Sequence, residues 1–254
     1  MALITGAGRG IGRRAAEVLA ARGYALALND RQEPTEALEA MRASGARVVA
    51  APGDVASEEA VAGIAAAALD AFGRIDVLVN NAGISLIAPA EDTTAQEWRH
   101  VLEVNLTGPF LLSQQIGRGM LLRGAGSIVN VASVAGLAGV ADRAAYNASK
   151  HGLVGLTRTL AAEWGGRGVR CNAVCPGWVK TEMDVADQSG GGYSDADIES
   201  RVPMGRFATP TDVAEAIAFL ADPERSGYVN GSTLSVDGGW YGDASWDGLR
   251  LRKR

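Results

Sequence analysis

The sequence predicts an α/β fold in which a doubly wound parallel sheet of about seven strands carries helices on both faces. Short apolar runs alternate along the 254 residues with longer Ala- and Leu-rich stretches, the pattern of repeated strand–helix–strand units. The short runs are apolar at successive positions, as strands covered by helices on both sides require. No repeat, low-complexity tract or linker divides the chain, so we expect residues 1–254 to form a single domain.

Seven segments have the length and composition of such buried strands. In chain order they are Ala2–Thr5, Tyr24–Asn29, Arg47–Ala51, Val77–Asn80, Ser127–Val131, Val169–Val174 and Thr233–Val236.

Three stretches between these strands carry helix boundary signals. Gly23 is suited to follow a helix end, Ser57 is suited to cap a helix start, and Thr209 with Pro210 also favours a start. The predicted helices are Arg13–Arg22, Glu58–Phe72 and Asp212–Leu220.

One long segment, residues 180–204, has no clear periodicity and contains Gly190-Gly191-Gly192. This composition favours a mobile segment. We interpret it as a substrate lid, with a disordered surface insertion as the alternative.

Composition excludes several classes of protein. The formal net charge of −5 argues against a nucleic-acid partner, and the short basic run from Arg250 to Arg254 is interpreted as a solvated tail. No apolar run approaches the roughly 20 residues that span a bilayer, and no export signal is present, so a cytoplasmic protein without a membrane partner is expected. Cys171 and Cys175 lack companion ligands and are interpreted as buried thiols, so no metal site is predicted.

A glycine-rich turn, Thr5–Gly12, directly follows the first predicted strand. Its residues Gly6, Gly10 and Gly12 permit backbone angles closed to other residues and let the chain approach a pyrophosphate. The unpaired N–H groups of the following helix would stabilise the phosphate charge. The spacing therefore predicts a dinucleotide site in a Rossmann-type sheet.

The acidic residue Asp30 ends the second predicted strand, 24 residues after Gly6. At that distance a carboxylate can accept hydrogen bonds from both hydroxyls of an adenosine ribose, and it would repel a 2′-phosphate. Arg9 and Arg31 instead favour NADP, because a guanidinium can bind the 2′-phosphate. The carboxylate favours NAD as cofactor, with NADP as the less favoured alternative.

Three polar residues suggest the chemistry. Ser133 follows the fifth predicted strand, and Tyr146 and Lys150 lie four residues apart, so that they share one helix face. A phenol titrates near 10, and a neighbouring cation is expected to lower that pKa into a range useful for proton transfer. Ser133 could then hold a substrate oxygen beside the phenol. By itself the Tyr–Lys spacing could be an ordinary pair on a helix surface. Together with Ser133 and the predicted dinucleotide site it favours hydride transfer between a nicotinamide and a carbonyl or alcohol.

Together these motifs resemble the classical short-chain dehydrogenase/reductase family along essentially the whole chain. The matching positions are Thr5–Gly12, Asp54-Val55, Asn80-Asn81-Ala82-Gly83, Asn105, Ser133, Tyr146, Lys150, Pro176-Gly177, Thr181 and Val236-Asp237-Gly238-Gly239.

The resemblance implies roles for these residues. Asp54 and Val55 would flank the adenine, Val179 and Thr181 would contact the carboxamide, and Asn105 would hold a water that passes protons to Lys150. Lys150 would also bind the nicotinamide ribose. The other implied cofactor contacts are Gly6, Arg9, Gly10, Ile11, Gly12, Asp30, Arg31, Asn81, Ala82, Gly83, Tyr146, Pro176 and Gly177. Without the resemblance, Asn105 could simply bond backbone groups and Thr181 could be a helix N-cap.

The substrate is less well defined by the sequence. In the family the pocket follows the catalytic serine and the Pro-Gly pair, which makes Ser133, Val134, Trp178, Met183 and Tyr193 the main candidates, with Leu137, Gly139, Ser85 and Trp240 as further ones. No Arg or Lys cluster is present there for an anionic substrate, which favours a neutral polyol or sugar-type secondary alcohol.

Alternatives remain open at this point. The family also contains 3-oxoacyl-thioester reductases, broad carbonyl reductases and hydroxysteroid dehydrogenases, and a non-catalytic nucleotide-binding regulator could use the same fold. The resemblance further implies a homotetramer formed through two long helices, here about Trp98–Arg118 and Tyr146–Trp164.

Overall fold

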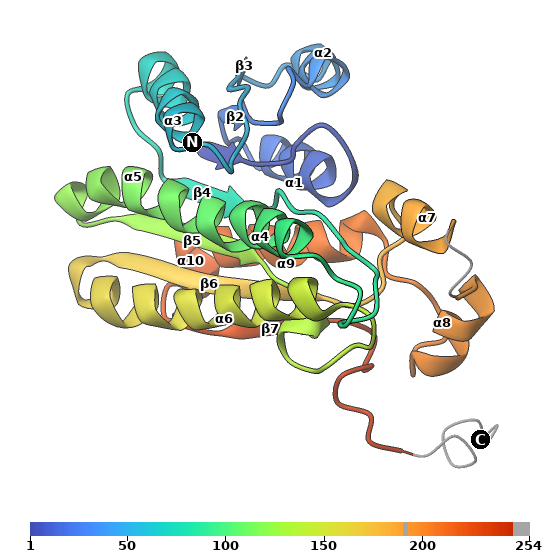
Figure 1. Ribbon diagram of the computed structural model, residues 1–254. Helices are drawn as coiled ribbons and strands as arrows, with labels where there is room; N and C mark the ends of the chain where they lie inside the picture. Colours follow the sequence, from blue (N-terminus) through green and yellow to red (C-terminus); the bar gives the residue numbers. More distant parts are fainter. Residues whose placement is uncertain (190–192, 246–254) are drawn as a thin grey trace.

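The computed structural model describes residues 1–189 and 193–245, which build one seven-stranded, fully parallel sheet in the order β3-β2-β1-β4-β5-β6-β7 (Figure 1). The predicted doubly wound α/β fold is confirmed. The strands are β1 (Ala2–Ile4), β2 (Leu26–Leu28), β3 (Val48–Ala50), β4 (Val77–Asn80), β5 (Gly126–Val131), β6 (Val169–Pro176) and β7 (Thr233–Val236).

The order of the strands reverses between β1 and β4. The chain first builds outward from β1 to β3, then returns to the other side of β1 and continues to β7. In open parallel sheets such a reversal leaves a crevice beyond the carboxyl ends of the strands, and ligands bind there. The glycine-rich turn after β1 and the Asn81-Ala82-Gly83 segment after β4 both begin at this edge.

Helices cover both faces of the sheet, because neighbouring residues of each central strand point to opposite sides. Ile4 packs into a core formed with α1 (Gly10–Ala21), α2 (Thr35–Ala43) and α9 (Pro210–Ala221). Leu3 packs on the opposite side, into a core with α3 (Glu58–Phe72), α5 (Gly108–Arg123) and α6 (Ala144–Trp164). Short elements complete the described part of the chain: α10 (Pro223–Ser226) and two 3₁₀ turns, Val134–Gly136 and Gly165–Arg167.

The predicted buried character of all strands is wrong at the two edges of the sheet. The central strands β1, β2, β4 and β6 are fully buried, whereas β3 and β7 are partly exposed along their length. Each edge strand has a neighbour on one side only, so fewer helices cover it.

The predicted helix Trp98–Arg118 is two α-helices joined by a π turn. α4 (Ala95–Leu102) leads directly into the π segment Glu103–Thr107, and α5 follows at once. A side chain at Gly108 would lie 2.7 Å from the carbonyl oxygen of Val55, so the start of α5 can approach the loop before α3 only because Gly108 has none.

Two short helices lie within residues 180–204, where the sequence shows no periodicity. α7 (Glu182–Gln188) and α8 (Asp195–Arg201) are each seven residues long. Each begins at a hydroxyl cap, Thr181 for α7 and Ser194 for α8. The central glycines 190–192 lie outside the described residues, and the lid interpretation stays a prediction. No helix within 1–189 or 193–245 has the length and apolar character needed to cross a membrane.

Candidate functional site

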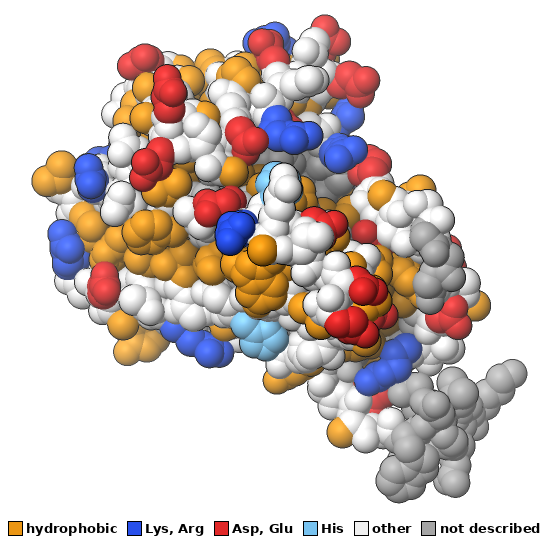
Figure 2. Space-filling view, viewed as in Figure 1, with side chains coloured by type: hydrophobic (Ala, Val, Ile, Leu, Met, Phe, Trp, Pro, Cys, Tyr) orange, Lys and Arg blue, Asp and Glu red, His pale blue; other side chains and the backbone are white. Residues whose placement is uncertain are grey.

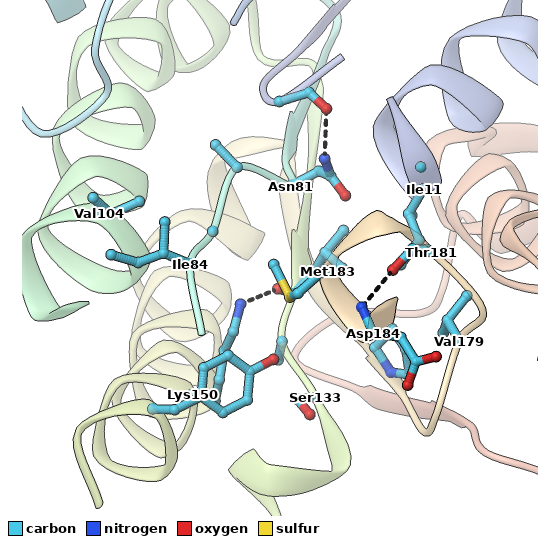
Figure 3. A pocket seen from close by; sticks show the side chains of 18 of the residues that line it. Ile11, Asn81, Ile84, Val104, Ser133, Lys150, Val179, Thr181, Met183 and Asp184 are labelled. Carbon is cyan, nitrogen blue, oxygen red and sulfur yellow. Dashed lines mark hydrogen bonds between the residues drawn. The ribbon is translucent and has the colours of Figure 1, made fainter. Parts of the chain in front are cut away.

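A cavity of about 370 Å³ opens at the carboxyl edge of the sheet, beside the reversal of the strand order. Figure 3 shows part of its wall, with Lys150 on one side, Thr181 and Asp184 on the other, and Met183 between them. Most of the predicted cofactor residues line it: Gly6, Arg9, Gly10, Ile11, Asp30, Arg31, Asp54, Val55, Asn81, Ala82, Gly83, Tyr146, Lys150, Pro176, Gly177, Val179 and Thr181.

The glycine-rich turn has the shape that a phosphate cradle needs. Gly6 and Gly10 have φ angles of +61° and +53°, a region that side chains disfavour. Gly12 does not line the cavity, but a Cβ there would lie 2.1 Å from the carbonyl oxygen of Gly6. Because these glycines have no side chains, the backbone of the turn is open to the cavity and α1 can lie close to the turn. These residues therefore fit a dinucleotide pyrophosphate.

The segment after β4 is tied to the glycine-rich turn. The hydroxyl of Thr5 accepts hydrogen bonds from the backbone N–H groups of Asn81 and Ala82, both at 2.9 Å. The side-chain amide of Asn81 donates to the carbonyl oxygens of Thr5 and Gly6, at 2.9 and 3.1 Å. Asn81 therefore holds the turn in position in addition to lining the cavity.

The carboxylate of Asp30 is fixed at the far end of the cavity from Tyr146. One oxygen accepts a hydrogen bond from Gly8 N at 3.1 Å and the other from Arg31 N at 2.8 Å. The side chains of Arg9 and Arg31 line the same cavity. The cavity is therefore lined by one carboxylate, which favours NAD, and by two guanidinium groups, which favour NADP. The sequence predicts the same combination.

The predicted catalytic side chains Ser133, Tyr146 and Lys150 line the other end of the cavity. Ser133 and Lys150 are 8% and 4% exposed. The Lys150 ammonium donates a 2.9 Å hydrogen bond to the carbonyl oxygen of Val131 and lies 5.6 Å from the centre of the Tyr146 ring. Burial lowers the pKa of Lys150 to about 8, because desolvation disfavours its charged form.

The predicted lowering of the Tyr146 pKa by Lys150 is wrong. Burial of the phenol is the largest influence and raises its pKa above the usual 10, while the Ser133 hydroxyl and the Arg143 charge act in the opposite direction. Sequence spacing places the ammonium on the same helix face but cannot reveal how strongly the site is desolvated.

Asn105 is fully buried beneath the site, within the π segment, and does not line the cavity. Its Oδ1 accepts from Ile84 N at 2.9 Å, and its Nδ2 donates to the Ile84 carbonyl at 2.9 Å and to the Ser149 hydroxyl at 3.2 Å. The backbone-bonding alternative therefore describes its side chain. Its role in holding a water stays a prediction.

Four of the predicted substrate residues, Val134, Trp178, Met183 and Tyr193, line the cavity together with Ser133. Of the further candidates, Leu137, Gly139, Ser85 and Trp240 do not line it. The ring centre of Trp240 lies 4.9 Å from that of Trp178, so the two aromatic side chains are neighbours. Thr181 is the N-cap of α7, which is the alternative role that the sequence allows. It also lines the cavity.

Several lining residues carry no sequence signal that could have identified them. They are Ile84, His100, Val140, Arg143, Glu182, Asp184 and Asp187. Three of them, Glu182, Asp184 and Asp187, belong to α7, and they reach the site because that short helix borders the cavity. Their i, i+2 and i+5 spacing resembles an ordinary solvated face.

One ion pair stands at the substrate end of the cavity. Arg143 Nη1 lies 2.9 Å from Asp187 Oδ2, and the two side chains are 13% and 16% exposed. The hydroxyl of Ser85 accepts from Arg143 at 2.8 Å and donates to Asp187 at 3.1 Å. The three residues come from the segment after β4, the residue before α6, and α7.

The fold and the site together define an oxidoreductase of the dinucleotide-binding α/β class. A family model described as enoyl-(acyl carrier protein) reductase matches residues 6–241, and the chain belongs to the short-chain dehydrogenase/reductase family.

Individual relatives cover nearly the full chain. The D-threitol dehydrogenase of Mycolicibacterium smegmatis is 42% identical over 94% of this chain and 92% of its own length. The 3-oxoacyl-[acyl-carrier-protein] reductase of a Synechocystis species is 38% identical over 94% and 96%. A crystal structure from Beutenbergia cavernae, described as a candidate NAD(P)-dependent gluconate 5-dehydrogenase with bound NADP at low occupancy, is 44% identical with a TM-score of 0.89 and covers 95% of this chain and 96% of that one.

Proposed function

We propose that this protein is an NAD(H)-dependent oxidoreductase that interconverts a secondary alcohol and its ketone, with a neutral polyol or sugar-type substrate. The observation that carries the proposal is the convergence of Ser133, Tyr146 and Lys150 at one end of a cavity whose other end holds Asp30. The likeness to a D-threitol dehydrogenase supports the polyol. The family and its relatives establish an oxidoreductase acting on CH–OH groups and a cofactor of the NAD(P) class.

The residues at the site supply the proton chemistry. When bound, the nicotinamide accepts a hydride during oxidation and donates one during reduction. Tyr146 takes the hydroxyl proton in oxidation and returns it to the carbonyl oxygen in reduction. The Ser133 hydroxyl holds that oxygen, and the Lys150 ammonium would bind the nicotinamide ribose. Asn105 fixes the segment that borders this end of the cavity.

Asp30 supports NAD over NADP. Its carboxylate is fixed by Gly8 N and Arg31 N, where it would accept hydrogen bonds from ribose hydroxyls and repel a 2′-phosphate. The NADP in the Beutenbergia structure and the presence of Arg9 and Arg31 support the alternative. We hold NAD to be preferred because the carboxylate is the acceptor that a free 2′-hydroxyl needs.

The main rival is a 3-oxoacyl-thioester reductase, which the Synechocystis relative supports. That activity would go with NADPH, so Asp30 weighs against it. A broad carbonyl reductase would differ only in its substrates. A non-catalytic nucleotide binder is disfavoured because Ser133, Tyr146 and Lys150 are all present and face one cavity.

Initial rates of cofactor reduction test the proposal. NAD and NADP are compared over polyols, sugars, aliphatic secondary alcohols, 3-hydroxyacyl thioesters and steroids, with Tyr146→Phe as the control. We expect NAD-dependent turnover of polyols, and a loss of most turnover in Tyr146→Phe with NAD binding retained. Substantial residual activity in that variant would contradict the role of Tyr146, and a preference for NADP and thioesters would favour the rival.

A further inference from the structure

The ion pair between Arg143 and Asp187 is built into the substrate end of the cavity. The backbone of Arg143 is fixed by a β-bridge to Ala88, and its side chain bonds Ser85 and Asp187. Arg143 Cζ lies 6.0 Å from the centre of the Tyr146 ring. The pair therefore stands beside the phenol that would act on the reacting hydroxyl.

Both partners keep polar atoms unused. Only Nη1 of Arg143 and Oδ2 of Asp187 take part in their hydrogen bonds with each other and with Ser85. Within residues 1–189 and 193–245, no protein partner is found for Nε and Nη2 of Arg143 or for Oδ1 of Asp187. The pair thus offers donors and an acceptor side by side, the combination that a hydroxyl group can satisfy in both directions.

The charge around the pair is unfavourable for an anion. The Arg143 cation is already compensated by Asp187. Two further carboxylates of α7 line the same cavity, but Asp184 pairs with Lys180 and Glu182 lies beside Gly10. Asp187 is therefore the carboxylate next to Arg143. A substrate carboxylate would accept hydrogen bonds but donate none, and it would meet the like charge of Asp187.

We propose that Asp187, held by Arg143 and Ser85, is a specificity-determining residue that binds a second hydroxyl group of a neutral polyol and discriminates against the corresponding sugar acid. This inference rests on the proposed alcohol oxidation. A substrate acid that displaced Asp187 and paired with Arg143 is the competing arrangement, and the experiment separates the two.

The test compares Asp187→Asn with the wild-type protein on three substrates in the presence of NAD. They are a four- or six-carbon polyol, the sugar acid of the same chain length, and a secondary alcohol with no other polar group. The substitution keeps the shape of residue 187 and removes its charge. Asp195→Asn is the matched control, because Asp195 begins α8 and bonds Lys180 and Gln188 without lining the cavity.

We expect Asp187→Asn to lower kcat/KM for the polyol by about 10- to 100-fold, because a hydrogen bond to a charged group is lost. The simple alcohol should change by less than about threefold, and the ratio of acid to polyol should rise at least about 10-fold, because Arg143 is no longer compensated. Asp195→Asn should leave all three ratios unchanged.

The possible failures are distinguishable. A wild-type protein that turns over none of these alcohols contradicts the proposed function and this inference with it. Wild-type turnover with unaltered discrimination in Asp187→Asn overturns this inference alone, as does an equal loss in Asp195→Asn, which would reduce Asp187 to a support of α7. A wild-type preference for the acid would assign Arg143 to the substrate carboxylate instead.

Discussion

Burial shifts the pKa values of Tyr146 and Lys150 in opposite directions. Burial raises the pKa of Tyr146 above its usual value and lowers that of Lys150 to about 8. The buried phenol therefore stays protonated at neutral pH, as a general acid requires. As a base it needs alkaline conditions or a nearby positive charge.

We predict opposite pH profiles for the two directions of the reaction. Oxidation needs the deprotonated phenol, so kcat/KM for the alcohol should rise with pH up to about 8, where the Lys150 ammonium begins to lose its proton. Reduction needs the protonated phenol, so its rate should stay level over about pH 6–8. Initial rates at constant ionic strength and saturating cofactor measure both. A pH-independent oxidation rate would show that another group, or a step before proton transfer, controls turnover.

Asp30 carries the prediction for the cofactor. Asp30→Ser removes the charge that would repel a 2′-phosphate and leaves Arg9 and Arg31 in the cavity wall. The ratio of kcat/KM for NAD to that for NADP should fall by about 10- to 100-fold. Glu33→Gln makes the same charge change at an exposed residue that does not line the cavity, and it should leave the ratio unchanged. A wild-type preference for NADP would show that the guanidinium groups dominate.

At the scale of elements, the close contact between the glycine-rich turn and α1 depends on Gly12. A Cβ at this position would lie 2.1 Å from the Gly6 carbonyl oxygen and 2.5 Å from the Asn81 amide nitrogen. Gly12→Ala should therefore lower the free energy of unfolding by about 1–3 kcal/mol or more and abolish cofactor binding. Denaturant unfolding and calorimetric titration with NAD measure the two effects.

Gly63→Ala is the control for this prediction. Gly63 lies in α3, where a Cβ would meet no atom within 4 Å. The added helix propensity should stabilise the protein by about 0.5–1 kcal/mol and leave cofactor binding unchanged. If Gly12→Ala bound NAD as well as the wild-type protein, the turn would have to shift without losing its function.

The same scale shows what sequence reasoning could and could not reach. The helix Glu58–Phe72 is predicted to the residue, because Ser57 caps it and Gly73 ends it with a positive φ. The helices α7 and α8 are not predicted, because a helix of seven residues has too few turns to show a hydrophobic periodicity. The ion pair between Arg143 and Asp187 is not predicted either, because it depends on where α7 lies and not on any spacing along the chain.

At the scale of the whole molecule, the sheet and the family are the most predictable features. Alternating strand and helix patterns, read with the right-handed crossover rule, specify a doubly wound sheet, and the residues at the carboxyl ends of its strands then converge on one crevice. What the sequence cannot give is the depth of that crevice, which sets the desolvation of Tyr146 and reverses the expected direction of its pKa.

Assembly is the remaining prediction at this scale. Figure 2 shows hydrophobic side chains gathered over α5, where Phe110 is 41% exposed, and Trp98 on the neighbouring α4 is 37% exposed. We propose a homotetramer in which α4, α5 and α6 of different copies meet. Light scattering after size exclusion should give about four times the chain mass, and Phe110→Glu should lower it. A monomer in the wild-type protein would contradict this assembly.

The π turn at Glu103–Thr107 has a consequence for how the chain can change in length. Each residue of an α-helix turns the following side chains by about 100°. Deleting one residue from this turn would restore an unbroken α-helix, an apparent local improvement, yet it would rotate α4 relative to α5 and carry Asn105 away from Ile84. The extra residue sets the rotation of α4 relative to α5, so a substitution at the exposed Glu103 should be tolerated far better than its deletion.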